Sequence, residues 1–267
     1  MAELKLDQGT ELRLITKEVG RAIGDFALIE DGDRVMVAVS GGKDSYALLH
    51  ALLALKRRAP VDFAIEAVNL DPGYPGYQTR VVKDHVEDLG VKIHMLDAPI
   101  HQLVQEKIAP GQPACPLCSR IRRGTFYTLC QRLGFNKLAL GHHLDDAVET
   151  LLMNMFYGGA MRAMPPILVR DEAPAVIRPL CYVLERTISD YARAVELPVI
   201  PCASAHCADA DRRRQVIKRH LTMLEADHPE IKNSVRRAMG NIDPRFLFVR
   251  AQTPGSVASA HLPNPST

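Results

Sequence analysis

The sequence predicts an α/β protein with a doubly wound, mainly parallel sheet and helical additions at the N- and C-termini. Three observations support this fold class: short apolar runs alternate with amphipathic segments, a glycine turn follows the first run, and polar residues follow several runs. Such alternation gives right-handed βαβ units, whose ligands bind beyond the carboxyl ends of the strands. The chain of 267 residues, 47% of them hydrophobic, is long enough for one large domain with appendages.

The expected elements follow from local patterns taken in order. Leu12, Ile15, Val19 and Ile23 recur at helical spacing and predict an amphipathic helix over 10–26. Val-rich runs of four to eight residues indicate buried parallel strands. We expect strands over 35–39, 63–70, 91–96 and 137–140, and helices over 46–53, 78–89 and 147–157.

These elements suggest four parts of the chain. Residues 1–31 form an N-terminal helical segment and residues 32–203 the catalytic domain. Residues 204–242 are expected to be a helical extension. The tail, 243–267, is rich in Pro, Ser and small residues, which predicts disorder.

The glycine turn has the features of a phosphate-binding loop. Backbone N–H groups and the positive end of a helix dipole converge there, and a lysine adds a full charge. It is not a Walker A loop, because Val37 stands where the first Gly is needed and Asp44 follows the Lys. Instead it resembles the pyrophosphate loop of the ATP-pyrophosphatase superfamily, which splits ATP between the α and β phosphates. The loop consists of Ser40, Gly41, Gly42, Lys43, Asp44 and Ser45.

Polar residues also follow the second and fourth expected strands. Asn69 and Asp71 follow one, and the segment from Gly141 to Asp146 follows the other. Asp145 and Asp146 suit the first turn of a helix, so capping is one explanation. The alternative is an adenylate-binding segment that also organises Mg²⁺. On that interpretation the ATP site comprises the loop residues together with Asn69, Gly141, His142 and Asp146. Lys43 and Asp44 would act in catalysis. The candidates for binding Mg²⁺ are Asp44, Asp145 and Asp146.

The cysteines suggest a metal centre. Cys115 and Cys118 form a C-x-x-C pair in an expected loop, and Cys202 follows an apolar run, 197–201, expected as a strand end. Three thiolates at one crevice would leave a coordination position open, as in a reactive site. Soft thiolates select zinc or iron–sulfur, and the sequence alone does not choose between them. Cys130 and Cys181 are expected to be structural.

Several motifs together resemble one family, the tRNA-cytidine 2-sulfurtransferases, from about residue 32 to 221. They are the segments 67–71, 115–124, 141–146, 154–159, 164–166, 177–180 and 200–202. The resemblance implies a [4Fe-4S] cluster on Cys115, Cys118 and Cys202, with ATP and Mg²⁺, and 2-thiocytidine at tRNA position 32 as product. The segment after Cys202 departs from the family pattern, so Cys207 remains an alternative third ligand.

The family resemblance also suggests partners. tRNA would be held by Arg120, Arg122 and Arg123, although a solvated basic face is the plainer explanation, and a cysteine desulfurase would donate sulfur. A homodimer is left open. No apolar run reaches the ~20 residues that span a membrane, so we expect a cytoplasmic protein without membrane contact. The rival hypotheses are another ATP-dependent tRNA-modifying enzyme of the superfamily and a non-enzymatic iron–sulfur RNA-binding sensor.

Overall fold

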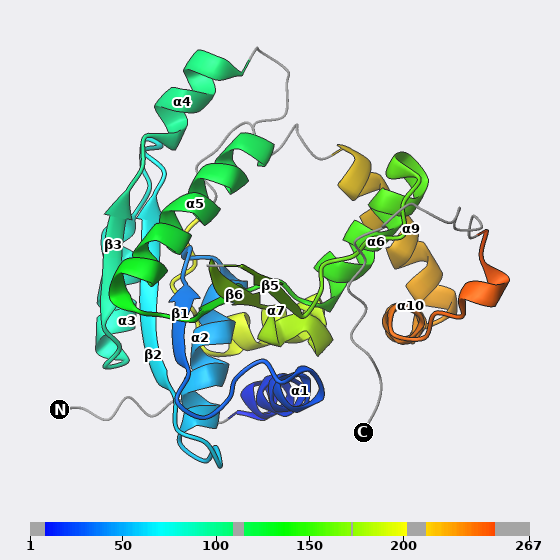
Figure 1. Cartoon of the computed structure of the whole chain (residues 1–267), viewed down its shortest axis with the longest axis horizontal. Coiled ribbons are helices and arrows are strands. Elements are labelled where there is room, and N and C mark those ends of the chain that lie inside the picture. The colour runs from blue at the N-terminus through cyan, green and yellow to red at the C-terminus, as the bar shows by residue number, and fades with distance from the viewer. Residues whose placement is uncertain (1–8, 109–114, 172, 202–211, 249–267) are drawn as a thin grey trace.

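The computed structural model describes residues 9–108, 115–171, 173–201 and 212–248. Within these ranges the chain forms one six-stranded sheet in the order β3-β2-β1-β4-β6-β5 (Figure 1). Neighbouring strands are parallel except β5, which runs antiparallel to β6. The predicted α/β fold is therefore confirmed. The strands are β1 (Arg34–Ala38), β2 (Ala64–Asp71), β3 (Ile93–Asp97), β4 (Lys137–Ala139), β5 (Ile167–Arg170) and β6 (Ala173–Ile177).

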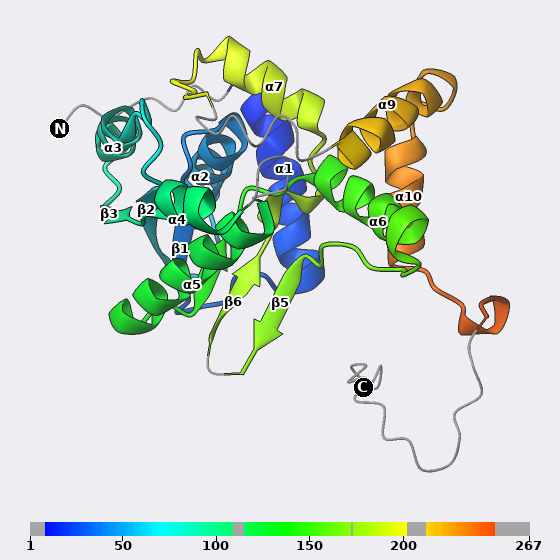
Figure 2. The same cartoon turned by 90° about the horizontal axis from the view of Figure 1, so that it is seen from above.

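Helices cover both faces of the sheet (Figure 2). Their order and bounds are α1 (Thr10–Phe26), α2 (Lys43–Lys56), α3 (Thr79–Asp88), α4 (Ile100–Lys107), α5 (Cys115–Leu133), α6 (Leu144–Gly158), α7 (Glu185–Ala194), α9 (Arg212–Asp227) and α10 (Ile231–Met239). Two short 3₁₀ turns, η1 (Pro179–Tyr182) and η2 (Pro244–Phe246), complete the described elements. In the described ranges, no helix is both long enough and apolar enough to cross a membrane.

The alternation of side chains in β1 explains the two layers of core. Val35 and Val37 belong to the cluster under α1, α2, α3 and α7, whereas Met36 belongs to the cluster under α4 and α5. All three are fully buried. A strand that buries side chains on both faces reads as a continuous apolar run, which is why this strand was predictable.

A third cluster joins α6 to the two C-terminal helices. Leu144 and Val148 of α6 pack against Ile217 and Leu221 of α9, and Val235 of α10 packs at the edge. These helices form an arm beside the sheet (Figure 1). The arm starts at the carboxyl end of β4, where α6 begins.

The sheet order places a topological switch point between β1 and β4. From β1 the chain adds β2 and β3 on one side, and later adds β4 and β6 on the other. Ligands of open parallel sheets bind in the crevice at such a point, outside the carboxyl ends of the strands. The glycine loop follows β1 and the segment from Gly141 follows β4, so both predicted nucleotide segments border this crevice.

Two local predictions were wrong. The C-x-x-C pair is not in a loop, because Cys115 begins α5 and Pro116 sits in its first turn, where a missing N–H costs nothing. Residues 197–201 do not form a strand. Pro198 and Pro201 cannot donate to a ladder, and Ile200 N–H instead donates to the carbonyl of Gly41, 3.0 Å away. The fourfold division of the chain remains a prediction, and 249–267 lies outside the described residues.

Candidate nucleotide-binding crevice

The glycine loop is closed by the hydroxyl of Ser45. Its Oγ donates to the carbonyl of Gly42 at 2.8 Å and accepts from the N–H of Ser40 at 3.2 Å. Gly42 is extended and serves as the N-cap of α2, so the N–H groups of Lys43 and Asp44 open a helix without intrahelical acceptors. The loop thus presents free backbone donors and the positive end of a helix to the crevice.

Two glycines have no room for a side chain. Gly41 has φ +82°, and a Cβ there would lie 2.4 Å from Cγ1 of Ile200. A Cβ on Gly141 would lie 3.1 Å from backbone atoms of Asp44 and Ser45. The missing side chains let the end of β4 and the segment around Ile200 approach the start of α2 closely.

Asn69 braces the loop from the neighbouring strand. It is fully buried, and its Nδ2 donates to the carbonyl of Val39 at 2.7 Å and to the hydroxyl of Tyr77 at 3.0 Å. The Tyr77 hydroxyl in turn donates to the carbonyl of Ser40 at 3.1 Å. Oδ1 of Asn69 has no hydrogen-bond partner among the described residues, so it is the atom of this side chain left to accept from a ligand.

The segment after β4 combines capping with the crevice. Asp146 N–H donates to Nδ1 of His143 at 3.4 Å, and His143 N–H donates to Oδ2 of Asp146 at 3.1 Å, a capping box at the start of α6. Capping by Asp146 is therefore confirmed, but its partner is His143, which was not among the site residues predicted from the sequence. Nε2 of His143 lies 3.9 Å from Oδ1 of Asp44. Burial lowers the pKa of neighbouring His142 to about 4, although Asp146 opposes the shift.

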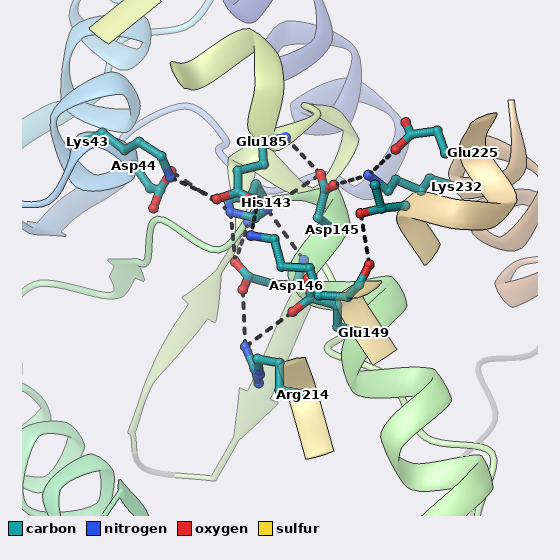
Figure 3. A network of polar contacts seen from close by, with 12 residues as sticks. Lys43, Asp44, His143, Asp145, Asp146, Glu149, Glu185, Arg214, Glu225 and Lys232 are labelled. Atoms are coloured by element: carbon teal, nitrogen blue, oxygen red, sulfur yellow. Dashed lines mark hydrogen bonds and ion pairs between the residues drawn. The ribbon is translucent and has the colours of Figure 1, made fainter. Parts of the chain in front are cut away.

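The loop lysine is held by two carboxylates. Nζ of Lys43 lies 2.9 Å from Oδ1 of Asp44 and 3.3 Å from Oε1 of Glu185, the first residue of α7 (Figure 3). The other oxygen of Glu185 accepts from Nζ of Lys218 in α9 at 2.6 Å. Burial alone would raise the pKa of Glu185, but Lys218 and Lys43 bring it down to about 2. Two carboxylates of the protein thus neutralise Lys43.

A second group of ion pairs ties α6 to the C-terminal helices (Figure 3). Asp145 accepts from Nζ of Lys232 in α10 at 2.7 Å and from the N–H of Glu185 at 2.7 Å, so both of its oxygens are engaged. Nη1 of Arg214 in α9 lies 3.4 Å from Oδ1 of Asp146 and 3.7 Å from Oε2 of Glu149. Burial raises the pKa of Glu149 to about 7, against the effect of Arg214.

These contacts separate the Mg²⁺ candidates. The described residues contain no ready-made group of three metal-ligating side chains. Mg²⁺ in nucleotide sites usually takes one or two carboxylates together with substrate phosphates and water. Asp44 and Asp146 also have protein partners, but their side chains are 31% and 20% exposed, whereas Asp145 is 5% exposed and bound by Lys232 and the backbone N–H of Glu185. Exposure therefore favours Asp44 and Asp146 as ligands. No charge pattern in the sequence marks Glu185 or Lys232, because they come from distant helices.

The cysteines are described only in part. Cys118 has a half-buried free thiol in the first turn of α5, and Cys115 begins the same helix three residues earlier. Residues three apart lie on one side of a helix. Cys202 and Cys207 lie outside the described residues. Cys130 and Cys181 are buried, which raises the pKa of each thiol to about 12 and fits the expected structural role. Arg120, Arg122 and Arg123 are exposed along α5.

Known proteins match this chain over most of its length. A family model described as a PP-loop domain matches residues 14–224. The tRNA-cytidine(32) 2-sulfurtransferase of Geobacter sulfurreducens is 49% identical over 235 residues, covering 88% of this chain and 91% of that protein. The enzyme of the same name from Anaeromyxobacter dehalogenans is 46% identical over 239 residues, covering 89% and 82%.

A solved structure shares the fold. The U34-tRNA thiolase NcsA from Methanococcus maripaludis, with its [4Fe-4S] cluster, superposes with a TM-score of 0.67 at 21% identity, covering 87% of this chain and 80% of that one. At this identity the likeness concerns the arrangement of sheet and helices. The extensive identity to curated relatives, together with the glycine loop at the switch point, shows that the chain belongs to the tRNA-cytidine(32) 2-sulfurtransferase family of PP-loop proteins.

Proposed function

We propose that this chain catalyses the ATP-dependent 2-thiolation of cytidine 32 in tRNA, by adenylation of the C2 oxygen followed by sulfur transfer. One observation carries the proposal. The Gly141 segment packs against the backbone of Asp44 and Ser45, and Ile200, two residues before Cys202, contacts Gly41, so both segments border the glycine loop. Nucleotide chemistry and sulfur chemistry would thus share one site. The activity for which the relatives are named supports the choice of substrate.

In this proposal the loop binds the β and γ phosphates of ATP. The N–H groups of Lys43 and Asp44 donate to the phosphate oxygens, and Lys43 exchanges its contact with Glu185 for one with phosphate. Asn69 Oδ1 accepts a hydrogen bond from the nucleotide. Gly141 lets the end of β4 pack against the backbone of Asp44 and Ser45, so that both segments can border the bound nucleotide.

Asp44 and Asp146 would hold Mg²⁺, which neutralises charge on the departing pyrophosphate. Cys115, Cys118 and Cys202 would hold a [4Fe-4S] cluster, which, when bound, supplies the position from which sulfur is delivered. The chemistry of the donor set supports this assignment, since thiolates three apart at a helix start are a common half-site for iron–sulfur ligation. A cysteine desulfurase is the proposed source of the sulfur.

The adenylation step explains the need for ATP. The C2 oxygen of the cytosine attacks the α-phosphorus, the bond to the bridging oxygen breaks, and pyrophosphate leaves. This converts a poor leaving group into an adenylate ester. Sulfur at the sulfide level then attacks C2, the bond from C2 to the adenylated oxygen breaks, and AMP departs with that oxygen. Sulfur that arrives as a desulfurase persulfide needs two electrons from a thiol reductant, which is oxidised to a disulfide, to reach this level. Charge builds on the leaving phosphates, so the fixed donors of the loop and Lys43 are what this step requires.

The tRNA substrate would be held by Arg120, Arg122 and Arg123, which lie on the helix that begins with the C-x-x-C pair. Position 32 lies in a loop of tRNA, where a base is splayed out at a small unpairing cost. Contacts of arginine with phosphate predict binding that weakens as salt rises.

Nucleoside mass analysis tests the proposal. tRNA from cells lacking this gene should contain no 2-thiocytidine at position 32, and complementation with the wild-type gene should restore it. Complementation with Lys43→Ala should fail. Normal 2-thiocytidine in the deletion strain would refute the proposal. Release of AMP and pyrophosphate with bulk tRNA separates an enzyme from an RNA-binding sensor, which would release neither.

A further inference from the structure

Three buried polar atoms without hydrogen-bond partners belong to neighbouring parts of the fold at the carboxyl edge of the sheet. They are Nε of Arg178, the hydroxyl of Tyr127 and Nδ1 of His142, none of which has a partner among the described residues. Arg178 directly follows β6, His142 follows the adjacent strand β4, and Tyr127 lies on α5, which packs against both strands. Unpartnered buried polar atoms are rare in folded proteins, and each needs an explanation.

Arg178 is held in place but not neutralised. Its Nη1 donates to the carbonyl of Pro165 at 2.7 Å, and its backbone N–H donates to the carbonyl of Pro166 at 2.8 Å. No carboxylate in the described part of the chain forms an ion pair with it. These contacts fix the guanidinium at the end of β6, and its Nε donor meets no acceptor in the described part of the chain.

A second arginine adds to the positive charge. Arg123 lies four residues before Tyr127, so the two share one side of α5. Burial lowers the pKa of Arg178, and the charge of Arg123 adds to the effect while Tyr127 opposes it. Arg178 is half-buried and Arg123 is exposed, and two neighbouring cations without a carboxylate between them favour a site that an anion completes.

We propose that Arg178, Tyr127 and Arg123 form a subsite for one phosphodiester of the RNA substrate, next to the nucleotide that is modified. The inference rests on the proposed function. A planar guanidinium with free N–H groups matches two phosphate oxygens, and a tyrosine hydroxyl donates a further hydrogen bond. A full anion fits two arginines better than a neutral base does.

The position of the subsite favours RNA over ATP as the source of the phosphate. β4 separates β6 from β1, which places the subsite about 10 Å along the sheet from the strand that leads into the glycine loop. The same helix, α5, carries Cys118 about 7.5 Å along its axis from Arg123. A phosphodiester bound here would place its nucleotide between the glycine loop and the C-x-x-C pair.

The test pairs a protein variant with a neutralised phosphate. An anticodon stem–loop RNA is prepared with a charge-neutral methylphosphonate on either side of residue 32, and its affinity is measured by fluorescence anisotropy. Arg178→Gln should weaken binding of unmodified RNA about tenfold or more. It should also reduce the slope of log affinity against log salt by roughly one. Affinity for a nonhydrolysable ATP analogue should stay within twofold.

The diagnostic result is non-additivity. One of the two methylphosphonates should weaken wild-type binding about tenfold and leave Arg178→Gln unaffected, because the partner is already lost. Arg170→Gln is the matched control. Arg170 is exposed on β5 opposite the start of β6, at the other end of the hairpin, and the variant should bind like wild type.

Arg178→Lys keeps the charge but lacks the paired N–H groups of the guanidinium, so it should recover only part of the affinity. That partial recovery would show that the loss in Arg178→Gln does not come from a folding defect. Wild-type protein that binds the RNA, with Arg178→Gln equally tight at every salt concentration, would overturn the subsite alone. Loss of ATP affinity with unchanged RNA affinity would assign the phosphate to the nucleotide and overturn it as well. Wild-type protein without RNA affinity would instead refute the proposed function, and the subsite with it.

Discussion

Replacing Gly41 by alanine tests the contact between the glycine loop and the segment that leads to Cys202. The new methyl group would lie 2.4 Å from Cγ1 and 2.5 Å from Cδ1 of Ile200 and 3.0 Å from Cγ2 of Val82. Ordinary contacts begin at 3.4 Å, so the neighbour would have to retreat by 1.0 Å, the difference between 3.4 and 2.4 Å. Ile200 is 8% exposed and packed in the core under α2, so it cannot move freely.

The expected magnitude has two parts. A residue with Cβ at φ +82° costs about 1–2 kcal/mol of backbone strain. Overpacking against Ile200 adds about 1–3 kcal/mol. Gly32 provides the matched control, because it has φ +79° and a methyl group added there would meet nothing within 4 Å. Gly32→Ala should therefore show the strain alone, and the difference between the two variants isolates the contact with Ile200.

The assay is urea unfolding of both variants, followed by equilibrium binding of a nonhydrolysable ATP analogue. Gly41→Ala should be less stable than Gly32→Ala by about 1–3 kcal/mol and should bind the analogue more weakly. Adding Ile200→Ala to Gly41→Ala should remove most of the overpacking part. Equal unfolding free energies for the two glycine variants would refute the claim that Ile200 fills the space above the loop.

Three further predictions concern charge and sulfur. Glu185→Gln should bind ATP roughly threefold to tenfold more tightly, because a carboxylate that competes with phosphate for Lys43 is removed; weaker binding in a direct titration would contradict that role. The pKa of Glu149 is raised from 4.5 to about 7, so folding favours its protonated form. Its stabilising contribution is complete below pH 4.5 and is lost as pH rises through 7. In urea unfolding, wild type should therefore lose stability relative to Glu149→Gln across that pH window. Parallel stability curves for the two proteins would show that the pKa of this carboxyl is not raised. Cys118→Ser, purified anaerobically, should lack iron and sulfide and should lose thiolation activity while it keeps its affinity for ATP. The control Cys130→Ala, on the same helix, should keep its iron. A Cys118→Ser variant that retains iron and activity would remove this thiol from the ligand set.

The parts of the fold that local patterns determine were predictable. The bounds of α1 agree with the prediction, because apolar residues recur along it at helical spacing. β1 is an apolar run buried on both faces, and the glycines after it mark the turn. The loop residues and the capping acid Asp146 stand in contiguous motifs, so the sequence was sufficient to place them in one crevice.

The remaining features depend on tertiary contacts that leave no local mark. The run 197–201 is apolar like a strand, but its prolines and its contact with Gly41 make it a packed segment beside the loop. β4 pairs with β6, which belongs to a hairpin that was not predicted from the sequence. Glu185 reaches Lys43 and Lys232 reaches Asp145 through the packing of α7 and α10, and an isolated charge in a helix does not reveal what it faces.

An isotope-transfer measurement tests the central claim, that the cytosine oxygen attacks ATP in this crevice. Anticodon stem–loop RNA carrying ¹⁸O at C2 of cytidine 32 would be thiolated by the holoenzyme with ATP under anaerobic conditions. We predict that the ¹⁸O is recovered in the phosphate of AMP, in equal amount to the 2-thiocytidine formed. AMP without the label, formed alongside 2-thiocytidine, would contradict adenylation of the C2 oxygen.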